Sequence, residues 1–144
     1  MALYRTTFPV AASADRVWEV ISDFAGWSGW NPSVPSIKGE LRTGSTCKVK
    51  LVMHGRPSVN VKVTLTDVDP GRRFAWHGNI AHDRFFAGDR SLEIEPQPDG
   101  TVLVTHTEEV TGAFFPVFKT LMGAATIQAH HDELNAGLKQ RAEL

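Results

Sequence analysis

Residues 13–24 constrain the fold more than any other part of this chain, because they carry the start and the periodicity of one helix. Ser13 is a favourable N-cap, and Asp15 lies where the positive end of the helix dipole favours a carboxylate. Apolar residues then recur on one helical face, at Val17, Val20, Ile21 and Phe24. The pattern predicts an amphipathic helix over about residues 14–24 that buries one side.

A second short helix is expected directly afterwards, around Trp27 and Trp30. Pro32 disfavours a helical conformation at Asn31, so this helix should end near Trp30. Two interpretations of the tryptophans stay open. Either they anchor the core, or they form a lid over a cavity, in which case at least one is partly exposed near its entrance.

Most of the remaining chain alternates apolar and polar residues, which is typical of half-buried strands. Strands are expected at about residues 3–11, 34–40, 47–53, 59–66, 72–78, 84–95 and 101–111, with turns at 54–57, 70–71 and 96–100. Cys47, within one of these strands, is expected to be a small buried hydrophobic residue. No linker, repeat or low-complexity segment interrupts the pattern.

A long helix is predicted to close the chain at about residues 115–141, with Pro116 in its first turn. Its expected inner stripe is Val117, Leu121, Ala124, Ile127, His131, Leu134 and Leu138. This order of elements predicts an α+β fold in which a curved antiparallel sheet wraps around the last helix. Small residues at 123–125 leave room between sheet and helix, so the space is either a ligand cavity or a closely packed core.

The same order of motifs resembles the START-related SRPBCC superfamily, and within it the polyketide cyclase/dehydratase-like branch. The segments that carry the resemblance are Tyr4–Val10, Ser13–Phe24, Trp27–Pro32, Pro70–Trp76, Pro96–Gly100, Thr105–Gly112 and the final helix. They span nearly the whole chain. The resemblance implies a helix-grip fold, one domain over residues 1–144, and a cavity between the sheet and the C-terminal helix.

Four polar residues share the phase of the apolar residues around them. Arg90 is in phase with Leu92 and Ile94, His106 and Glu108 are in phase with the valines of the last strand, and His131 lies on the helix stripe. Because a buried charge must be paired, the structural interpretation is an Arg90–Glu108 ion pair with a histidine neighbour. In the catalytic interpretation the same four residues are the candidates, with a histidine moving a proton and arginine stabilising an enolate.

The predicted ligand-binding residues combine this group with apolar wall residues. They are Trp27, Trp30, Met53, Val63, Phe74, Trp76, Phe86, Arg90, His106, Glu108, Leu121, Ala124 and His131. Phe85 and Phe86 beside Gly88 form an apolar edge suited either to gating ligand entry or to a dimer contact, so a homodimer stays open.

Composition and motifs exclude several other classes. The formal net charge is −1 and the basic residues are scattered, which argues against nucleic-acid binding. No metal-ligand spacing and no phosphate-binding glycine loop occur, so neither metal nor organic cofactor is expected. A single cysteine, no signal peptide and no long apolar run predict a cytoplasmic protein without an integral membrane segment.

Three functions stay open at this stage. The first is binding of a small hydrophobic molecule of the lipid, polyketide or isoprenoid type. The second is a polyketide cyclase or dehydratase that uses no cofactor. The third is an interaction module like the chaperone ATPase-activator branch of the same superfamily. The sequence indicates a ligand cavity more clearly than a set of catalytic residues, so binding of a small hydrophobic molecule is the preferred function.

Overall fold

A computed structural model describes residues 2–53 and 56–144 of the chain. In chain order the elements are β1 (Ala2–Val10), α1 (Ala14–Ser22), the 3₁₀ helix η1 (Phe24–Gly29), β2 (Ser36–Lys38), β3 (Thr46–Leu51), β4 (Val59–Asp69), β5 (Arg73–Asn79), β6 (Ala87–Pro96), β7 (Val102–Thr111), α2 (Phe115–Met122) and α3 (Ala124–Ala142). The predicted α+β helix-grip fold is confirmed. The turn expected at 54–57 falls partly on residues 54–55, which lie outside the described residues.

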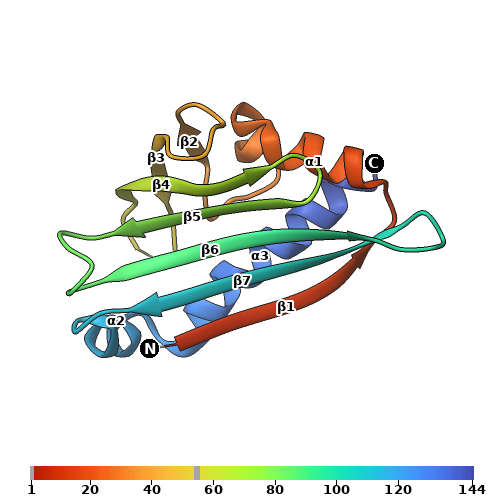
Figure 1. The fold of residues 1–144 in the computed structure, drawn as a ribbon. Coiled ribbons are helices and arrows are strands. Elements are labelled where there is room, and N and C mark those ends of the chain that lie inside the picture. Colours follow the sequence, from red (N-terminus) through yellow and green to blue (C-terminus); the bar gives the residue numbers. More distant parts are fainter. Residues whose placement is uncertain (1, 54–55) are drawn as a thin grey trace.

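The seven strands of the described residues form one antiparallel sheet, in the order β1-β7-β6-β5-β4-β3-β2. Neighbouring strands along the chain pair as hairpins from β2 to β7, and β1 returns to pair with β7. The register shifts between Leu65 and Asp67, a bulge that bends β4. Figure 1 shows the sheet lying over α3, with α1 and η1 at one end and α2 at the other.

The helix predicted from residues 13–24 forms over nearly that range. The Ser13 hydroxyl accepts a hydrogen bond from the Arg16 backbone N–H at 3.1 Å, which caps the first turn. Val17, Val20 and Ile21 are buried, so the predicted apolar face does meet the core. The helix ends at Ser22, and the 3₁₀ helix η1 follows from Phe24.

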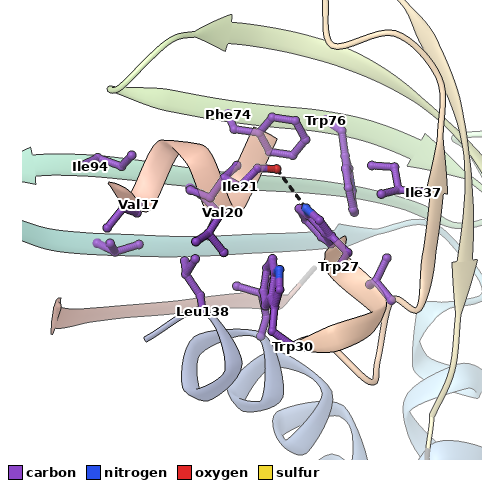
Figure 2. Close-up of a cluster of buried hydrophobic side chains, with 14 of the residues drawn as sticks. Val17, Val20, Ile21, Trp27, Trp30, Ile37, Phe74, Trp76, Ile94 and Leu138 are labelled. Atoms are coloured by element: carbon purple, nitrogen blue, oxygen red, sulfur yellow. Dashed lines mark hydrogen bonds between the residues drawn. The ribbon is translucent and has the colours of Figure 1, made fainter. Parts of the chain in front are cut away.

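The two tryptophans after this helix belong to the hydrophobic core (Figure 2). Trp27 is fully buried, and its indole N–H donates to the Ile21 carbonyl at 2.9 Å. Trp30 packs on it with ring centroids 4.8 Å apart. The expectation that one of them is partly exposed near a cavity entrance is therefore wrong, because η1 turns both rings inward between the sheet and α3.

The single long helix predicted at 115–141 is two helices. Gly123 separates α2 from α3 with φ +84° and ψ 140°, a backbone conformation that glycine adopts at low cost. The break redirects α2, so Val117, Leu121 and Ala124 are exposed rather than part of an inner stripe. The remaining predicted positions, Ile127, His131, Leu134 and Leu138, are buried as expected.

Cys47 is buried in the core, as predicted for a small hydrophobic residue. Among residues 2–53 and 56–144, no helix combines the length and apolar character needed to cross a bilayer.

Candidate ligand-binding site

A cavity of about 380 Å³ lies between the inner face of the sheet and the two C-terminal helices. Strands β3 to β7 form one wall, and α2 with the start of α3 forms the other. The residues that line it are Val49, Leu51, Met53, Arg56, Pro57, Val59, Val61, Val63, Trp76, Gly78, Asn79, Ile80, Phe86, Gly88, Asp89, Arg90, Glu108, Val110, Phe115, Phe118, Met122, Ile127 and His130. Most of this surface is aliphatic or aromatic, which is the usual character of a small-molecule site.

The cavity exists because the chain places small residues where the sheet faces the helices. Gly88 lies on the wall, and a Cβ built there meets nothing within 4 Å. Gly78 also lies on the wall, although a Cβ there would come close to Val63. A larger side chain at position 88 would project into the cavity, so this glycine helps to keep the cavity open.

The inner end of the cavity is closed by a polar cluster, defined here as Arg90, His106, Glu108, His130 and His131. Arg90 donates from Nη2 to Glu108 Oε2 at 3.1 Å and to His130 Nε2 at 3.2 Å. Its guanidinium carbon lies 5.4 Å from the centre of the Trp76 ring, a cation–π distance. The Arg90 side chain is 4 % exposed and that of Glu108 is 20 % exposed, so the pair is largely removed from water.

The two remaining histidines of the polar cluster lie behind this pair. His106 donates from Nδ1 to the Asn135 side-chain oxygen at 2.8 Å, and His131 Nε2 hydrogen-bonds with the Thr6 hydroxyl at 3.1 Å. His131 Nδ1 lies 3.6 Å from Glu108 Oε2. Both rings are buried and neither lines the cavity, so they support Glu108 from behind.

Burial and charge set the protonation of the polar cluster. Burial, and then the nearby Arg90 charge, lower the pKa of His106 to about 2 and that of His130 to about 4. Burial alone would raise the pKa of Glu108, but the Arg90 guanidinium and the nearby His131 ring outweigh it and hold that pKa below its usual range. At neutral pH the cavity therefore ends in a paired carboxylate with two neutral histidines beside it.

The polar cluster also contains the atoms of a candidate metal site. One ligand atom from each of His106, Glu108 and His131 lies within 4.8 Å of the others. However, Arg90 already neutralises the only carboxylate of this trio. A divalent cation would then add uncompensated positive charge in a buried place, which is unfavourable. The arrangement is better suited to an internally paired cluster than to a metal centre.

The structure divides the predicted ligand-binding residues into two groups. Met53, Val63, Trp76, Phe86, Arg90 and Glu108 lie on the cavity wall. Trp27, Trp30 and Phe74 are core residues instead, and Leu121 and Ala124 face outward. The prediction that those five residues line the cavity is wrong, and so is the same prediction for the buried His106 and His131. The inward turn of η1 places Trp27 and Trp30 in the core, and the helix break at Gly123 leaves Leu121 and Ala124 outside. The predicted Arg90–Glu108 ion pair is present, with three histidines around it rather than one.

His130 is the member of the polar cluster that the sequence patterns did not predict. It lies one residue from His131, about 100° away around a helix, so one apolar stripe could not include both. The curved sheet packs around α3 widely enough to bury both rings. The apolar wall from Phe115, Phe118 and Met122 was missed as well, because the turn at Gly123 decides which side of α2 faces inward.

These features define a helix-grip protein with an internal cavity, and comparisons place the chain in a family. Residues 1–143 match the family model described as polyketide cyclase / dehydrase and lipid transport. The chain belongs to that family. A search of curated proteins gives no match.

Solved structures with the same fold are distant in sequence. A START superfamily protein from Mycobacterium smegmatis is 20 % identical with a TM-score of 0.70, covering 96 % of this chain and 97 % of its own. The Zhui aromatase/cyclase from Streptomyces sp. R1128 is 20 % identical with a TM-score of 0.67, covering 97 % and 93 %. A norcoclaurine synthase mutant from Thalictrum flavum, in complex with a transition state analogue, is 14 % identical with a TM-score of 0.68, covering 98 % and 93 %. At these identities the likeness extends to the fold.

Proposed function

We propose that this protein binds a small hydrophobic molecule in the cavity between the sheet and the C-terminal helices. The observation that carries the proposal is the cavity itself, which has a volume of about 380 Å³ and a mostly apolar wall. Sites for small molecules commonly measure about 300–1,000 Å³ and combine an apolar wall with a few polar groups. The ligand class is a lipid, polyketide or isoprenoid, in keeping with a family described by polyketide chemistry and lipid transport.

The polar cluster gives the bound ligand a direction. Arg90 and Glu108 are the charged groups at the inner end, and they neutralise each other. A ligand hydroxyl or carbonyl placed beside this pair would find a hydrogen-bond partner, whereas the same group against the aliphatic wall would lose its bonds to water. The apolar body of the ligand then lies along β3 and β4, toward Phe86 and Phe118.

Native mass spectrometry tests the proposal directly. Protein purified from its own host and sprayed under non-denaturing conditions should carry a bound hydrophobic molecule that organic extraction releases. In parallel, the purified apoprotein should titrate an environment-sensitive fatty-acid probe with saturable, one-to-one binding. Absence of both a co-purified ligand and saturable probe binding would overturn the proposal.

One observation favours a second candidate, a cofactor-free polyketide cyclase. Glu108 is held as a carboxylate next to the Arg90 guanidinium at the end of an apolar chamber. A carboxylate in that position can take a proton from carbon next to a ketone, and the guanidinium can stabilise the enolate oxygen that forms. Turnover of a poly-ketone by the wild type, lost in Glu108→Gln, would support this candidate. The carrier stays preferred, because Glu108 is already paired and two histidines of the cluster are sealed from the cavity.

A further inference from the structure

Of the eight large exposed apolar side chains among the described residues, five gather around the outer edge of the cavity. We call Ile80, Phe85, Phe114, Val117 and Leu121 the mouth patch. On α2 and the residue before it, Phe114, Val117 and Leu121 are 56 %, 57 % and 65 % exposed. Ile80 and Phe85 belong to the β5–β6 connection, which lies at the same end of the sheet as α2 (Figure 1). Exposed apolar groups that cluster in this way mark an interaction surface.

The mouth patch is continuous and rigidly joined. The Phe85 and Phe114 rings stack with centroids 5.2 Å apart. Two backbone hydrogen bonds tie the segments together, from Ala113 N–H to the Arg84 carbonyl and from Phe114 N–H to the Phe85 carbonyl, both 2.9 Å long. The β5–β6 connection and the start of α2 therefore present their exposed apolar side chains on one joined surface.

The same elements form the wall of the cavity. Phe115, Phe118 and Met122 of α2 line the cavity, while Val117 and Leu121 of that helix face outward. Ile80 belongs both to the mouth patch and to the cavity wall, since it is exposed and also lines the cavity. Whatever covers the mouth patch consequently sits directly against the outer edge of the ligand cavity.

Three basic side chains lie around the mouth patch, against the two acidic side chains Asp83 and Asp89. Arg56, Arg84 and Lys119 are exposed beside it, and Arg56 also donates to the Leu121 carbonyl at 2.8 Å. The nearby Asp83 is hydrogen-bonded by His77 and Asn79. Residues 110–131 contain no aspartate or glutamate. Apolar residues ringed by arginine and lysine suit an anionic lipid surface, where both burial and charge contribute to binding.

We propose that the mouth patch docks on an anionic lipid bilayer, so that an apolar ligand passes between bilayer and cavity without crossing water. This inference rests on the proposed function. A second copy of the chain is the competing occupant, but the area of the patch is too small for a stable dimer interface. Five half-exposed large side chains offer on the order of 500 Å², against about 800 Å² per partner in a stable interface. A bilayer needs only a few inserted side chains and complementary charge.

Vesicle sedimentation tests the docking. The wild type should sediment with phosphatidylcholine vesicles that contain phosphatidylglycerol, and more weakly with phosphatidylcholine alone. The double variant Val117→Asp/Leu121→Asp should lose about tenfold or more of this binding, because two apolar side chains no longer insert. Leu144→Asp is the matched control, since Leu144 is exposed at the opposite end of the molecule and should leave binding unchanged.

Two further measurements separate the outcomes. Neither Val117 nor Leu121 lines the cavity, so the double variant should still titrate the fatty-acid probe in solution. Equal vesicle binding by wild type and double variant, or none by the wild type, overturns the docking. A wild-type dimer that the double variant splits, seen by analytical ultracentrifugation, also overturns it in favour of a second copy. Vesicle binding without any probe binding keeps the docking and overturns the proposed function.

Discussion

The imidazole rings of His106 and His131 stack face to face, with centroids 3.9 Å apart and an angle of 2° between their planes. One ring comes from β7 and the other from α3, so the stack joins the sheet to the helix that it grips. The Asn135 side-chain oxygen accepts a hydrogen bond from His106, and the Thr6 hydroxyl hydrogen-bonds with His131. Placing a proton on His106 would set a positive charge beside Arg90 in a buried site, which is why its pKa is depressed.

Stability should therefore decrease below neutral pH. His106 and His130 have folded-state pKa values of about 2 and about 4, below the unfolded value near 6.5, so the unfolded chain binds more protons as the pH falls. The contribution of these two histidines to the free energy of unfolding should be constant above pH 6.5 and fall by up to about 1.4 kcal/mol per pH unit for each histidine below it. Denaturant unfolding at several pH values measures this.

The control for this experiment is His130→Gln, which should reduce the acid-side slope by about one proton, or about 1.4 kcal/mol per pH unit. The contribution of His77 to the pH dependence is the same in the wild type and in His130→Gln. Its raised pKa, caused by the hydrogen bond to Asp83 and also by Asp89, acts in the opposite direction. That contribution is full below pH 6.5 and is lost as the pH rises through the folded pKa. An identical slope in wild type and variant would contradict the buried, neutral state of His130.

Removing one partner of the Arg90–Glu108 pair should destabilise the fold strongly. Glu108→Ala leaves the Arg90 guanidinium buried and without its carboxylate, a change that typically costs about 3–5 kcal/mol. The double variant Arg90→Met/Glu108→Leu removes both charges and should recover most of the loss. Urea unfolding of Glu108→Ala and of the double variant measures how much of the loss comes from the unpaired guanidinium. Equal loss in Glu108→Ala and the double variant would show that the unpaired Arg90 charge is not the cause of the destabilisation.

Filling the cavity should reduce ligand binding without unfolding the protein. Gly88 lies on the cavity wall on β6, and a Cβ there meets no atom within 4 Å. Gly88→Leu should weaken probe binding by about tenfold or more, because the leucine occupies space the ligand needs. Glu95→Leu, at an exposed position on the same strand, is the matched control. Unchanged probe affinity in Gly88→Leu would place the bound probe elsewhere.

Gly137→Ala should destabilise the fold by about 1–3 kcal/mol, because an added Cβ would overlap the Trp30 backbone carbonyl. Gly137 lies on α3 and Trp30 directly follows η1, so this contact joins the two elements. Gln140→Ala, exposed on the same helix, is the control and should be neutral or slightly stabilising. The Tm by calorimetry distinguishes the two. A Tm for Gly137→Ala equal to wild type would mean that the α3–η1 packing adjusts freely.

Local patterns were sufficient for most of the elements and for part of the polar cluster, although they did not predict the break in the last helix. The capped helix after Ser13 and the strand alternation depend on neighbours a few residues apart, and both formed as predicted. Strand phase also placed Arg90 and Glu108 on the inner face, where cross-strand pairing sets them directly opposite each other. A buried guanidinium needs a carboxylate, so the ion pair followed from phase and charge together.

Tertiary structure decided which residues surround the cavity. Gly123 adopts a positive φ that turns α2 away from α3, and this turn exchanges Leu121 for Phe118 and Met122 on the wall. The inward turn of η1 removes Trp27 from the mouth and adds it to the core. His130 became an inner residue because the sheet curves around α3. Each outcome depends on the direction in which a whole element packs, and periodicity within one element carries no information about that direction.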